Sequence, residues 1–209
     1  MTRPQLLLAT RNADKLAELR RILAAAHGDD VELLGLDDEP AYDEAPETGG
    51  TFAENALAKA RDGVRHTGLP TVADDSGLAV AALGGMPGVL SARWAGRHGD
   101  DLANLRLVLD QLTDVPRERR AAAFVCAAAL VTPAGDERVV EGRMEGAVID
   151  APRGEQGFGY DPIFVADGQT RTNAELTPQE KDALSHRGRA FRALAPVIAS
   201  VLGQERAAG

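Results

Sequence analysis

The sequence predicts an α/β fold with a mixed β-sheet, and two observations carry the prediction. Short apolar runs alternate with amphipathic helical patterns over residues 5–80, which is typical of β-α-β-α-β units. The following chain reads as a helix, a long β-hairpin and a helix, so the sheet must also contain antiparallel neighbours. The 209 residues, 44% of them hydrophobic, are enough for one domain with a sizeable core.

Apolar runs locate the expected strands. Residues 5–10 and 31–36 are short and apolar, as buried strands are. The run 71–73 precedes two acids, and we expect the strand to end there and lead into a loop. Residues 120–132 and 137–149 flank the turn sequence PAGD and predict the hairpin.

Periodicity and capping patterns locate the helices. Residues 12–26 place leucine and isoleucine at helical spacing, and Asn12 is a suitable N-cap. Residues 51–68 begin with Thr51 and Glu54, a capping box, and end at a glycine. Residues 100–112 are amphipathic.

The C-terminal part combines a glycine-rich loop with helical sequence. Residues 154–165, GEQGFGYDPIFV, predict a loop that enters a short strand. Residues 176–203 are mostly helical and begin at a second capping box, and Pro196 is expected to bend or break the last helix. We expect the tail, residues 204–209, to fray and residues 1–209 to form a single domain.

Composition excludes several classes of function. A net charge of −9 argues against a nucleic-acid or membrane-surface binder, which needs a basic face. The N-terminal apolar run is too short for a signal peptide, and one cysteine, Cys126, suits a reducing cytoplasm. Arginine occurs 20 times but lysine only at Lys15, Lys59 and Lys181, so each lysine is a candidate for a site that needs a compact charge.

The first strand–helix junction, ATRNADK, is suited to binding an anion. A loop that leads from a buried strand into a helix N-terminus is a natural phosphate site. Thr10 and Asn12 supply hydrogen bonds for a phosphate or a sugar, and Arg11 and Lys15 supply positive charge. The alternative is a helix cap followed by solvated cations.

The stretch ADDSG places two carboxylates, Asp74 and Asp75, directly after a buried strand. Adjacent acids repel each other, and Mg²⁺, which prefers carboxylate and phosphate oxygens, would remove that repulsion. One of the acids would then orient or deprotonate a water molecule for attack on phosphorus. Glu47, in the acidic segment 37–50, would complete the metal shell. The alternative is a turn cap beside a solvated acid.

Two further segments carry chemistry. In GFGYDPIF, Phe158 and Tyr160 offer rings for stacking on a base, and Asp161 offers an acceptor for its edge. The alternative is a β-bulge with core aromatics. The segment EKDALSHRGRAF offers donors for carbonyl or phosphate oxygens, with a solvated helix end as the alternative; these side chains are Lys181, Ser185, His186, Arg187 and Arg189.

Five segments in order, between residues 6 and 191, resemble the non-canonical purine nucleoside triphosphate pyrophosphatase family, also known as inosine triphosphate pyrophosphatases. They are LATRNADKLAELRRIL, ETGGTFAENALAKA, the stretch from ADDSGLAV to SARWAG, GFGYDPIF and ELTPQEKDALSHRGRAF. The resemblance implies a homodimer with an elongated mixed sheet flanked by helices, in two lobes with a central nucleotide cleft. It also implies Mg²⁺-dependent hydrolysis of ITP, dITP and XTP to the monophosphate and pyrophosphate.

The resemblance also implies roles for residues. Asp75 would be the metal-linked general base. Many family members carry a second metal-linked acid where Pro46 stands here, so the second ligand would be the neighbouring Glu47, with Glu54 or neither acid as the alternatives. His186 and Arg187 would donate to the 6-oxo group of the base. The implied substrate contacts are Thr10, Arg11, Asn12, Ala13, Asp14, Lys15, Ser76, Phe158, Gly159, Tyr160, Asp161, Lys181, His186 and Arg187.

Three other functions remain open at this point. The chain would instead be a related pyrophosphatase for modified or pyrimidine nucleotides, a nucleotide-binding regulator that does not hydrolyse its ligand, or an α/β protein without a ligand. Adjacent acids beside a polyphosphate argue against a pure binder. A panel of nucleoside triphosphates, with and without Mg²⁺, separates these alternatives.

Overall fold

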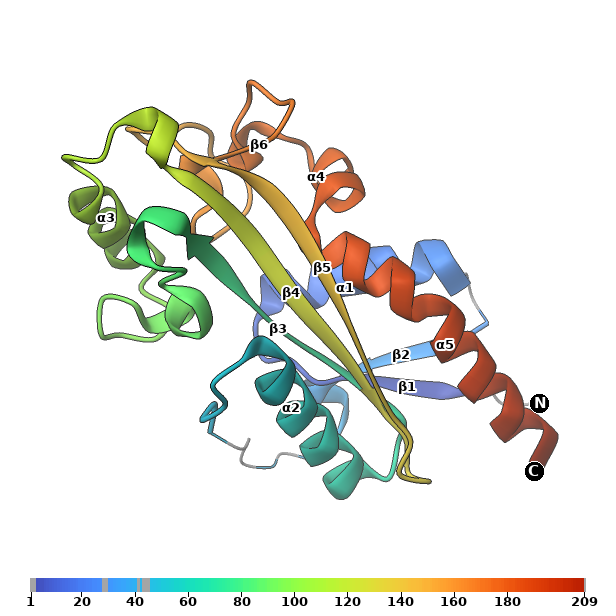
Figure 1. The fold of residues 1–209 in the computed structure, drawn as a ribbon. Helices are drawn as coiled ribbons and strands as arrows, with labels where there is room; N and C mark the ends of the chain where they lie inside the picture. Colours follow the sequence, from blue (N-terminus) through green and yellow to red (C-terminus); the bar gives the residue numbers. More distant parts are fainter. Residues whose placement is uncertain (1–2, 28–29, 41, 43–45, 209) are drawn as a thin grey trace. The chain divides into compact units, whose positions relative to one another are not determined.

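A computed structural model describes residues 3–27, 30–40, 42 and 46–208, and its strands form a six-stranded mixed sheet flanked by helices (Figure 1). The order in the sheet is β2-β1-β3-β4-β5-β6; β1 pairs in parallel with β2 and β3, and β5 pairs antiparallel with β6. The strands are β1 Gln5–Leu8, β2 Glu32–Gly35, β3 Thr71–Val80, β4 Ala121–Val131, β5 Glu137–Val148 and β6 Phe164–Ala166. The helices are α1 Ala13–His27, α2 Phe52–Thr67, α3 Asp101–Gln111, α4 Pro178–Leu184 and α5 His186–Ala208.

The chain divides into two compact units, and β3, β4 and β5 each run from one into the other. The first unit comprises Met1–Asp75, Cys126–Gly142 and Arg187–Gly209, and the second comprises Ser76–Val125 and Arg143–His186. Each unit has its own hydrophobic core. The two lobes with a central nucleotide cleft that the family resemblance implies stay a prediction.

In the first unit, strand alternation directs side chains to two separate cores. Leu6 and Leu8 of β1 pack with apolar residues of α1 and α5, whereas Leu7 packs with alanines of α2 on the other face (Figure 1). The same alternation continues in β3, where Val72 joins the first core and Ala73 the second. Residues that follow in β3 therefore also point alternately to the two faces.

In the second unit, α3 and the outer parts of the strands enclose one core. It contains Leu78 of β3, Phe124 of β4, Met144 of β5 and Phe164 of β6. The rings of Phe124 and Phe164 pack edge to face, with centroids 4.8 Å apart. This core supports the glycine-rich loop that precedes β6.

The main correction to the sequence-based prediction concerns β3. We expected the strand to end at residue 73, but it continues to Val80, and Asp74 and Asp75 lie within it, both buried. The apolar residues after the acids keep the strand in the sheet. The carboxylates remain buried because each has cationic and hydrogen-bonding partners, described below.

The capping predictions are confirmed, with one difference. Thr51 accepts a hydrogen bond from the Glu54 N–H, and Gly68 ends α2 at a φ of 71°. The Glu54 carboxylate, however, accepts from the Gly50 N–H, at 2.7 Å. The second capping box, at the start of α4, has both of its hydrogen bonds.

Of the two predicted effects of Pro196, a bend or a break of the last helix, the break is wrong. Helix α5 continues through it, because Phe191, Leu194 and Ile198 bury one side of the helix in the first core. The break lies earlier, at Ser185, between α4 and α5. Helix α5 ends at Ala208, residue 209 lies outside the described part of the chain, and the fraying of residues 204–209 stays a prediction.

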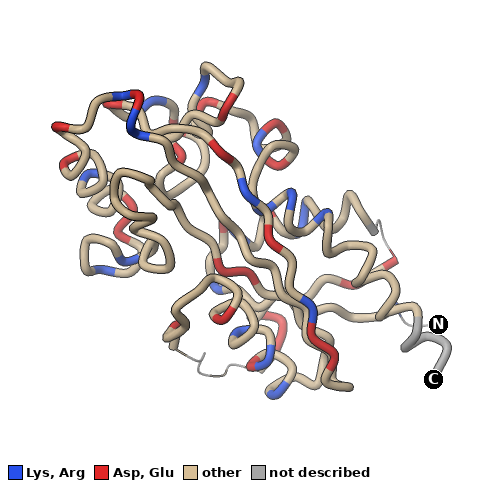
Figure 2. The backbone as a smooth tube through the Cα atoms, in the orientation of Figure 1, with Lys and Arg blue, Asp and Glu red and all other residues tan. Residues whose placement is uncertain are grey.

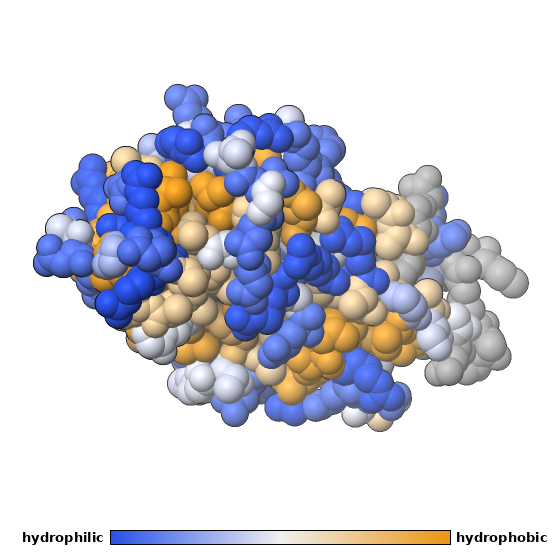
Figure 3. Space-filling view, turned by 45° about the horizontal axis from the view of Figure 1, so that its top comes forward, coloured by the Kyte–Doolittle hydropathy of each residue, from blue (hydrophilic) through white to orange (hydrophobic). Residues whose placement is uncertain are grey.

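Charges of both signs cover the surface. Along β5, exposed Glu141, Arg143 and Glu145 alternate with buried residues. Figure 2 shows residues of both charges distributed along the described chain. On the face shown in Figure 3, hydrophobic side chains form several patches separated by hydrophilic ones. None of the described helices has both the length and the apolar character required to span a bilayer.

Candidate active site

In the first unit, a lysine joins an acid on one face of β3 to an acid of the segment that precedes α2. The Lys59 ammonium, on α2, forms an ion pair with Glu47 and lies 3.6 Å from Asp75 Oδ1. Asn55, one turn earlier on α2, donates from Nδ2 to Asp75 Oδ2 at 2.9 Å. Helix α2 therefore supplies both an amide that orients Asp75 and a cation that holds the two acids close together.

The segment that carries Glu47 is tied to the same helix. The Gly49 N–H donates to Asn55 Oδ1 at 2.8 Å, so Asn55 binds this segment with its oxygen and Asp75 with its nitrogen. A Cβ at Gly49 would lie 2.6 Å from Asn55 Oδ1, so a larger residue would separate the segment from the helix. The sequence TGG before α2 thus serves to place Glu47 beside Lys59.

Electrostatics at this pair favour a base and a bound cation. Burial raises the pKa of the Asp75 carboxyl above its usual value, against the opposing effect of Lys59. Burial lowers the Lys59 pKa, but Asp75 and Glu47 outweigh that effect, so its pKa is raised overall. A carboxylate with a raised pKa is a stronger base, and two acids around one cation make a position suited to a positive ion.

The other face of β3 carries Asp74 in a different environment. Its Oδ2 accepts from Lys15 Nζ at 3.1 Å and from Arg187 Nε at 3.2 Å, and Arg187 Nη1 donates to Glu18 at 2.5 Å. Burial opposes ionisation of Asp74, but Lys15 and Arg187 outweigh it and hold the pKa of the carboxyl well below its usual range. Two carboxylates and two cations therefore form a buried ion network.

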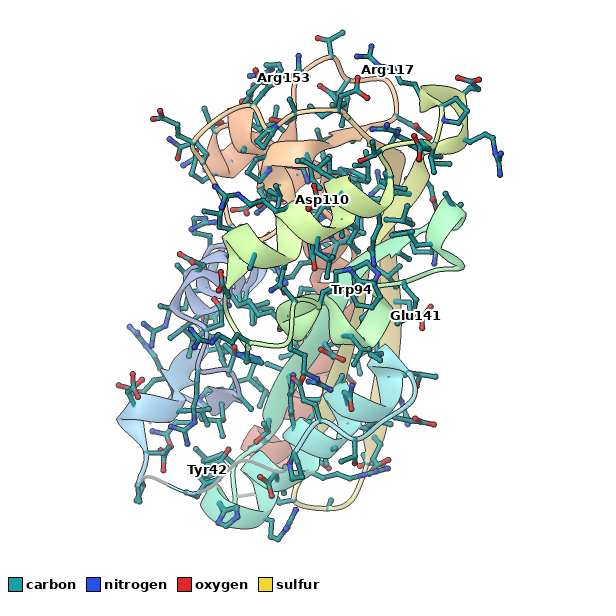
Figure 4. The ribbon with its side chains drawn as sticks, turned by 90° about the vertical axis from the view of Figure 1, so that its left-hand side faces the viewer. Tyr42, Trp94, Asp110, Arg117, Glu141 and Arg153 are labelled. Carbon is teal, nitrogen blue, oxygen red and sulfur yellow. The ribbon has the colours of Figure 1, made fainter. Side chains whose placement is uncertain are left out.

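The start of α1 combines a helix cap with predicted phosphate ligands. Asn12 Oδ1 accepts the Lys15 N–H at 3.0 Å, which confirms the predicted N-cap. Arg11 donates from Nη2 to the Tyr42 carbonyl at 2.6 Å, and the Tyr42 ring (labelled in Figure 4) stacks on His66 with centroids 4.3 Å apart. At this junction, the buried carboxylate of Asp74 holds the Lys15 ammonium in place.

In the second unit, Asp161 organises the glycine-rich loop. Its Oδ2 accepts from Lys181 Nζ at 2.6 Å and from the Phe158 N–H at 3.0 Å, and its Oδ1 accepts from Asn173 Nδ2 at 3.1 Å. The Lys181 ammonium lies 4.7 Å from the centre of the Phe158 ring, within cation–π distance. Phe158, Asp161 and Lys181, predicted together from the sequence, do come together.

Tyr160 is a scaffold residue here. Its ring is buried in the core and its hydroxyl donates to the Ser91 carbonyl at 2.8 Å, so it does not present a face for stacking in this structure. The neighbouring Gly159, at a φ of +61°, donates its N–H to Asp101 at 2.8 Å. Phe158 is therefore the ring of this loop that is half-exposed.

The remaining predicted residues are placed as follows. His186 is buried and its ring stacks on Phe124, with centroids 4.9 Å apart, whereas the next residue, Arg187, belongs to the ion network of the first unit. Ser76 follows Asp75 in β3 and is half-buried, and Ala13 and Asp14 are exposed in the first turn of α1.

The carboxylate pair fits a hard divalent cation only in part. Among the described residues, no group of three or more histidine, cysteine, aspartate or glutamate side chains is arranged to hold a metal. Asp75 and Glu47 are two oxygen donors around a position that a cation already occupies. Mg²⁺ is commonly held by one or two carboxylates plus water and substrate phosphates, so the donor set suits a metal that is also bound by phosphate oxygens.

A family model described as the Ham1 family matches residues 6–197. The chain belongs to the Ham1 family. It is 61% identical to the dITP/XTP pyrophosphatase of Mycobacteroides abscessus, over 98% of this chain and 99% of that protein, and 65% identical to the dITP/XTP pyrophosphatase of Nocardia farcinica, over 96% and 98%.

Solved structures agree with this assignment. The crystal structure titled nucleoside-triphosphatase / dITP/XTP pyrophosphatase from Mycobacterium abscessus aligns with a TM-score of 0.75 and 64% identity, over 92% of this chain and 99% of that one. A HAM1 protein from Coxiella burnetii aligns with a TM-score of 0.83 and 40% identity, over 94% and 99%. The mixed α/β fold is therefore that of the Ham1 family, as the sequence resemblance predicted.

The structure places several residues beside the candidate ligands of this Ham1 protein to which the sequence alone gave no role. Lys59 was a candidate only as one of three lysines in a chain rich in arginine. Nothing in the local sequence singles out the others, since their roles arise from contacts between distant segments. They are Glu18, Asn55, Ser91, Asp101 and Asn173.

Proposed function

We propose that this chain hydrolyses dITP, ITP and XTP to the nucleoside monophosphate and pyrophosphate with the help of Mg²⁺. The observation that carries the proposal is the Lys59-linked pair of Asp75 and Glu47, a base and a cation site on one face of β3. The printed names of relatives at 61% and 65% identity support the choice of substrate.

The catalytic step follows from the chemistry of Asp75. Its carboxylate accepts a proton from a water molecule, whose oxygen forms a bond to the α-phosphorus. The bond from that phosphorus to the bridging oxygen breaks, and pyrophosphate leaves. Asp75 and Glu47 would hold Mg²⁺, which supplies positive charge to the phosphate oxygens when bound. Asn55 keeps Asp75 oriented throughout.

Lys15 is the proposed tail ligand of the first unit. It is positioned by Asp74, which is itself held by Arg187, so a protein with a net charge of −9 presents a fixed local cation to an anionic tail. Thr10 to Asp14, at the start of α1, would contribute hydrogen bonds from the helix N-terminus.

The second unit would bind the base. Phe158 offers a ring, and Lys181 above it offers a cation that prefers the 6-oxo group of hypoxanthine or xanthine. A donor that faces the amino group of adenine instead would be left unpaired, at a cost of about 1–3 kcal/mol. His186 remains a predicted donor to the same oxygen, alongside Lys181.

Release of pyrophosphate from a panel of triphosphates tests the proposal. We expect turnover of dITP, ITP and XTP to exceed that of dATP, dGTP and the pyrimidine triphosphates, and removal of Mg²⁺ with EDTA to abolish it. Preference for a pyrimidine substrate, or binding of dITP without turnover, would contradict the assignment. We also propose a homodimer, which sedimentation equilibrium would test.

A further inference from the structure

Asn173 is a buried amide beside the Asp161 carboxylate of the second unit. It is 1% exposed and begins the short 3₁₀ helix Asn173–Glu175. Its Nδ2 donates to Asp161 Oδ1 at 3.1 Å, while Oδ2 accepts from Lys181 and from the Phe158 N–H. Each oxygen of the Asp161 carboxylate therefore accepts from its own donors, and the Asn173 amide is the donor to Oδ1.

The segment that carries this asparagine is fixed to the backbone of the glycine-rich loop. The Glu155 and Gln156 N–H groups both donate to the Ala174 carbonyl, at 3.1 and 2.9 Å. Thr172 Oγ1 donates to the Arg153 carbonyl at 2.8 Å, in the region where Figure 4 labels Arg153. The amide thus reaches Asp161 from a rigid support, as a positioning group must.

The charges around Asp161 explain why a donor on Oδ1 matters. A lysine ammonium is a compact point charge that can approach either oxygen of a carboxylate. The Asn173 amide on Oδ1 leaves Oδ2 as the position for Lys181, and from there the ammonium lies 4.7 Å from the centre of the Phe158 ring. Without the amide, a buried carboxylate oxygen lacks a donor and draws the ammonium towards itself.

We propose that Asn173 is a positioning residue for base recognition: its hydrogen bond to Asp161 fixes Lys181 and the Phe158 backbone in one arrangement. The inference rests on the proposed function, because it assumes that Phe158 and Lys181 bind the base. It adds a residue that lies outside the predicted contact set. A purely structural role would instead affect stability without discriminating between the base and the triphosphate.

The test compares a ligand that has a base with one that lacks it. In Asn173→Ala, we expect the KM for dITP to rise about tenfold, while kcat and inhibition by inorganic tripolyphosphate stay within about twofold of wild type. In Asn173→Asp, which conserves volume but replaces the donor with a carboxylate, the KM should rise at least as much.

Asn104→Ala provides the matched control. Asn104 is also 1% exposed in the second unit, but its side chain binds the backbone of Ala92 and Ala95. This variant should lose thermal stability and keep the wild-type KM.

Three outcomes would overturn the proposal. One is an unchanged KM in both Asn173 variants, and another is an equal change in dITP and tripolyphosphate binding. The third is loss of folded protein in both variants, which would assign Asn173 to the fold. Absence of dITP hydrolysis in the wild type is a separate result, because it would contradict the proposed function instead.

Discussion

Two neighbouring acids on opposite faces of β3 in the first unit have different charged partners and opposite pKa shifts. Asp74 accepts from two cations within a closed ion network, and its pKa is lowered. Asp75 shares one lysine with Glu47, and burial raises its pKa. The two acids are consecutive in the chain, yet strand alternation places their carboxylates in different environments.

The difference shows how a chain accommodates two adjacent acids in a buried strand. Repulsion is reduced because the side chains point away from each other, and each face supplies its own cation. A carboxylate with fixed cationic partners holds other residues in place. A carboxylate with a raised pKa and a lysine shared with a second acid is suited to proton transfer and to metal binding.

Replacing Asp75 should have the largest effect, because it removes the proposed base. We expect Asp75→Asn to lower kcat for dITP about a thousandfold while the free energy of unfolding changes by less than about 1 kcal/mol. Pyrophosphate release and urea unfolding measure the two quantities. Near-wild-type turnover would remove Asp75 from catalysis and end the functional distinction between the two faces.

Replacing Asp74 should reverse this pattern. Asp74→Asn leaves the buried Arg187 and the half-buried Lys15 with less compensating charge, so we expect a loss of about 3 kcal/mol in the free energy of unfolding. Its residual kcat should exceed that of the Asp75 variant. Urea unfolding of both variants side by side checks the prediction, and equal stability of the two would show that the ion network contributes little.

Truncation of Lys15 tests whether the side of β3 that carries Asp74 also takes part in substrate binding. We expect Lys15→Ala to raise the KM for dITP about tenfold, because a charged contact to the triphosphate is lost, with a smaller change in kcat. Inhibition by inorganic tripolyphosphate should weaken in parallel. If neither constant moves, Lys15 belongs only to the ion network.

The smallest expected effect is on thermal stability, at the exposed carboxylate of Glu180. Arg171 and the Thr177 backbone lower the pKa of Glu180 from 4.5 to about 2. Because the folded-state pKa is the lower one, this contribution is complete above pH 4.5 and is lost as the pH falls towards 2. Glu180→Gln should therefore lower Tm slightly at pH 7, and the difference should shrink in acid. A difference that grows in acid would contradict the assigned sign.

Local sequence determined much of this protein. Periodicity, capping residues and turn composition placed the helices and most strands, because these depend on neighbours three or four residues apart. The ordered motifs indicated the family and the acids, lysines and aromatic ring of the candidate site. The comparisons confirm the family and the fold class.

Tertiary structure alone decided which partner each of these groups has. The strand continues through Asp74 and Asp75 because the charges that compensate them come from distant segments, with Arg187 lying 113 positions after Asp74. Likewise, α5 continues through Pro196 because its apolar face is buried in the core, an energy that local propensity does not contain. Contacts between distant segments set the burial and the charged partners of each acid. They place Asp74 in the ion network and leave Asp75 suited to proton transfer.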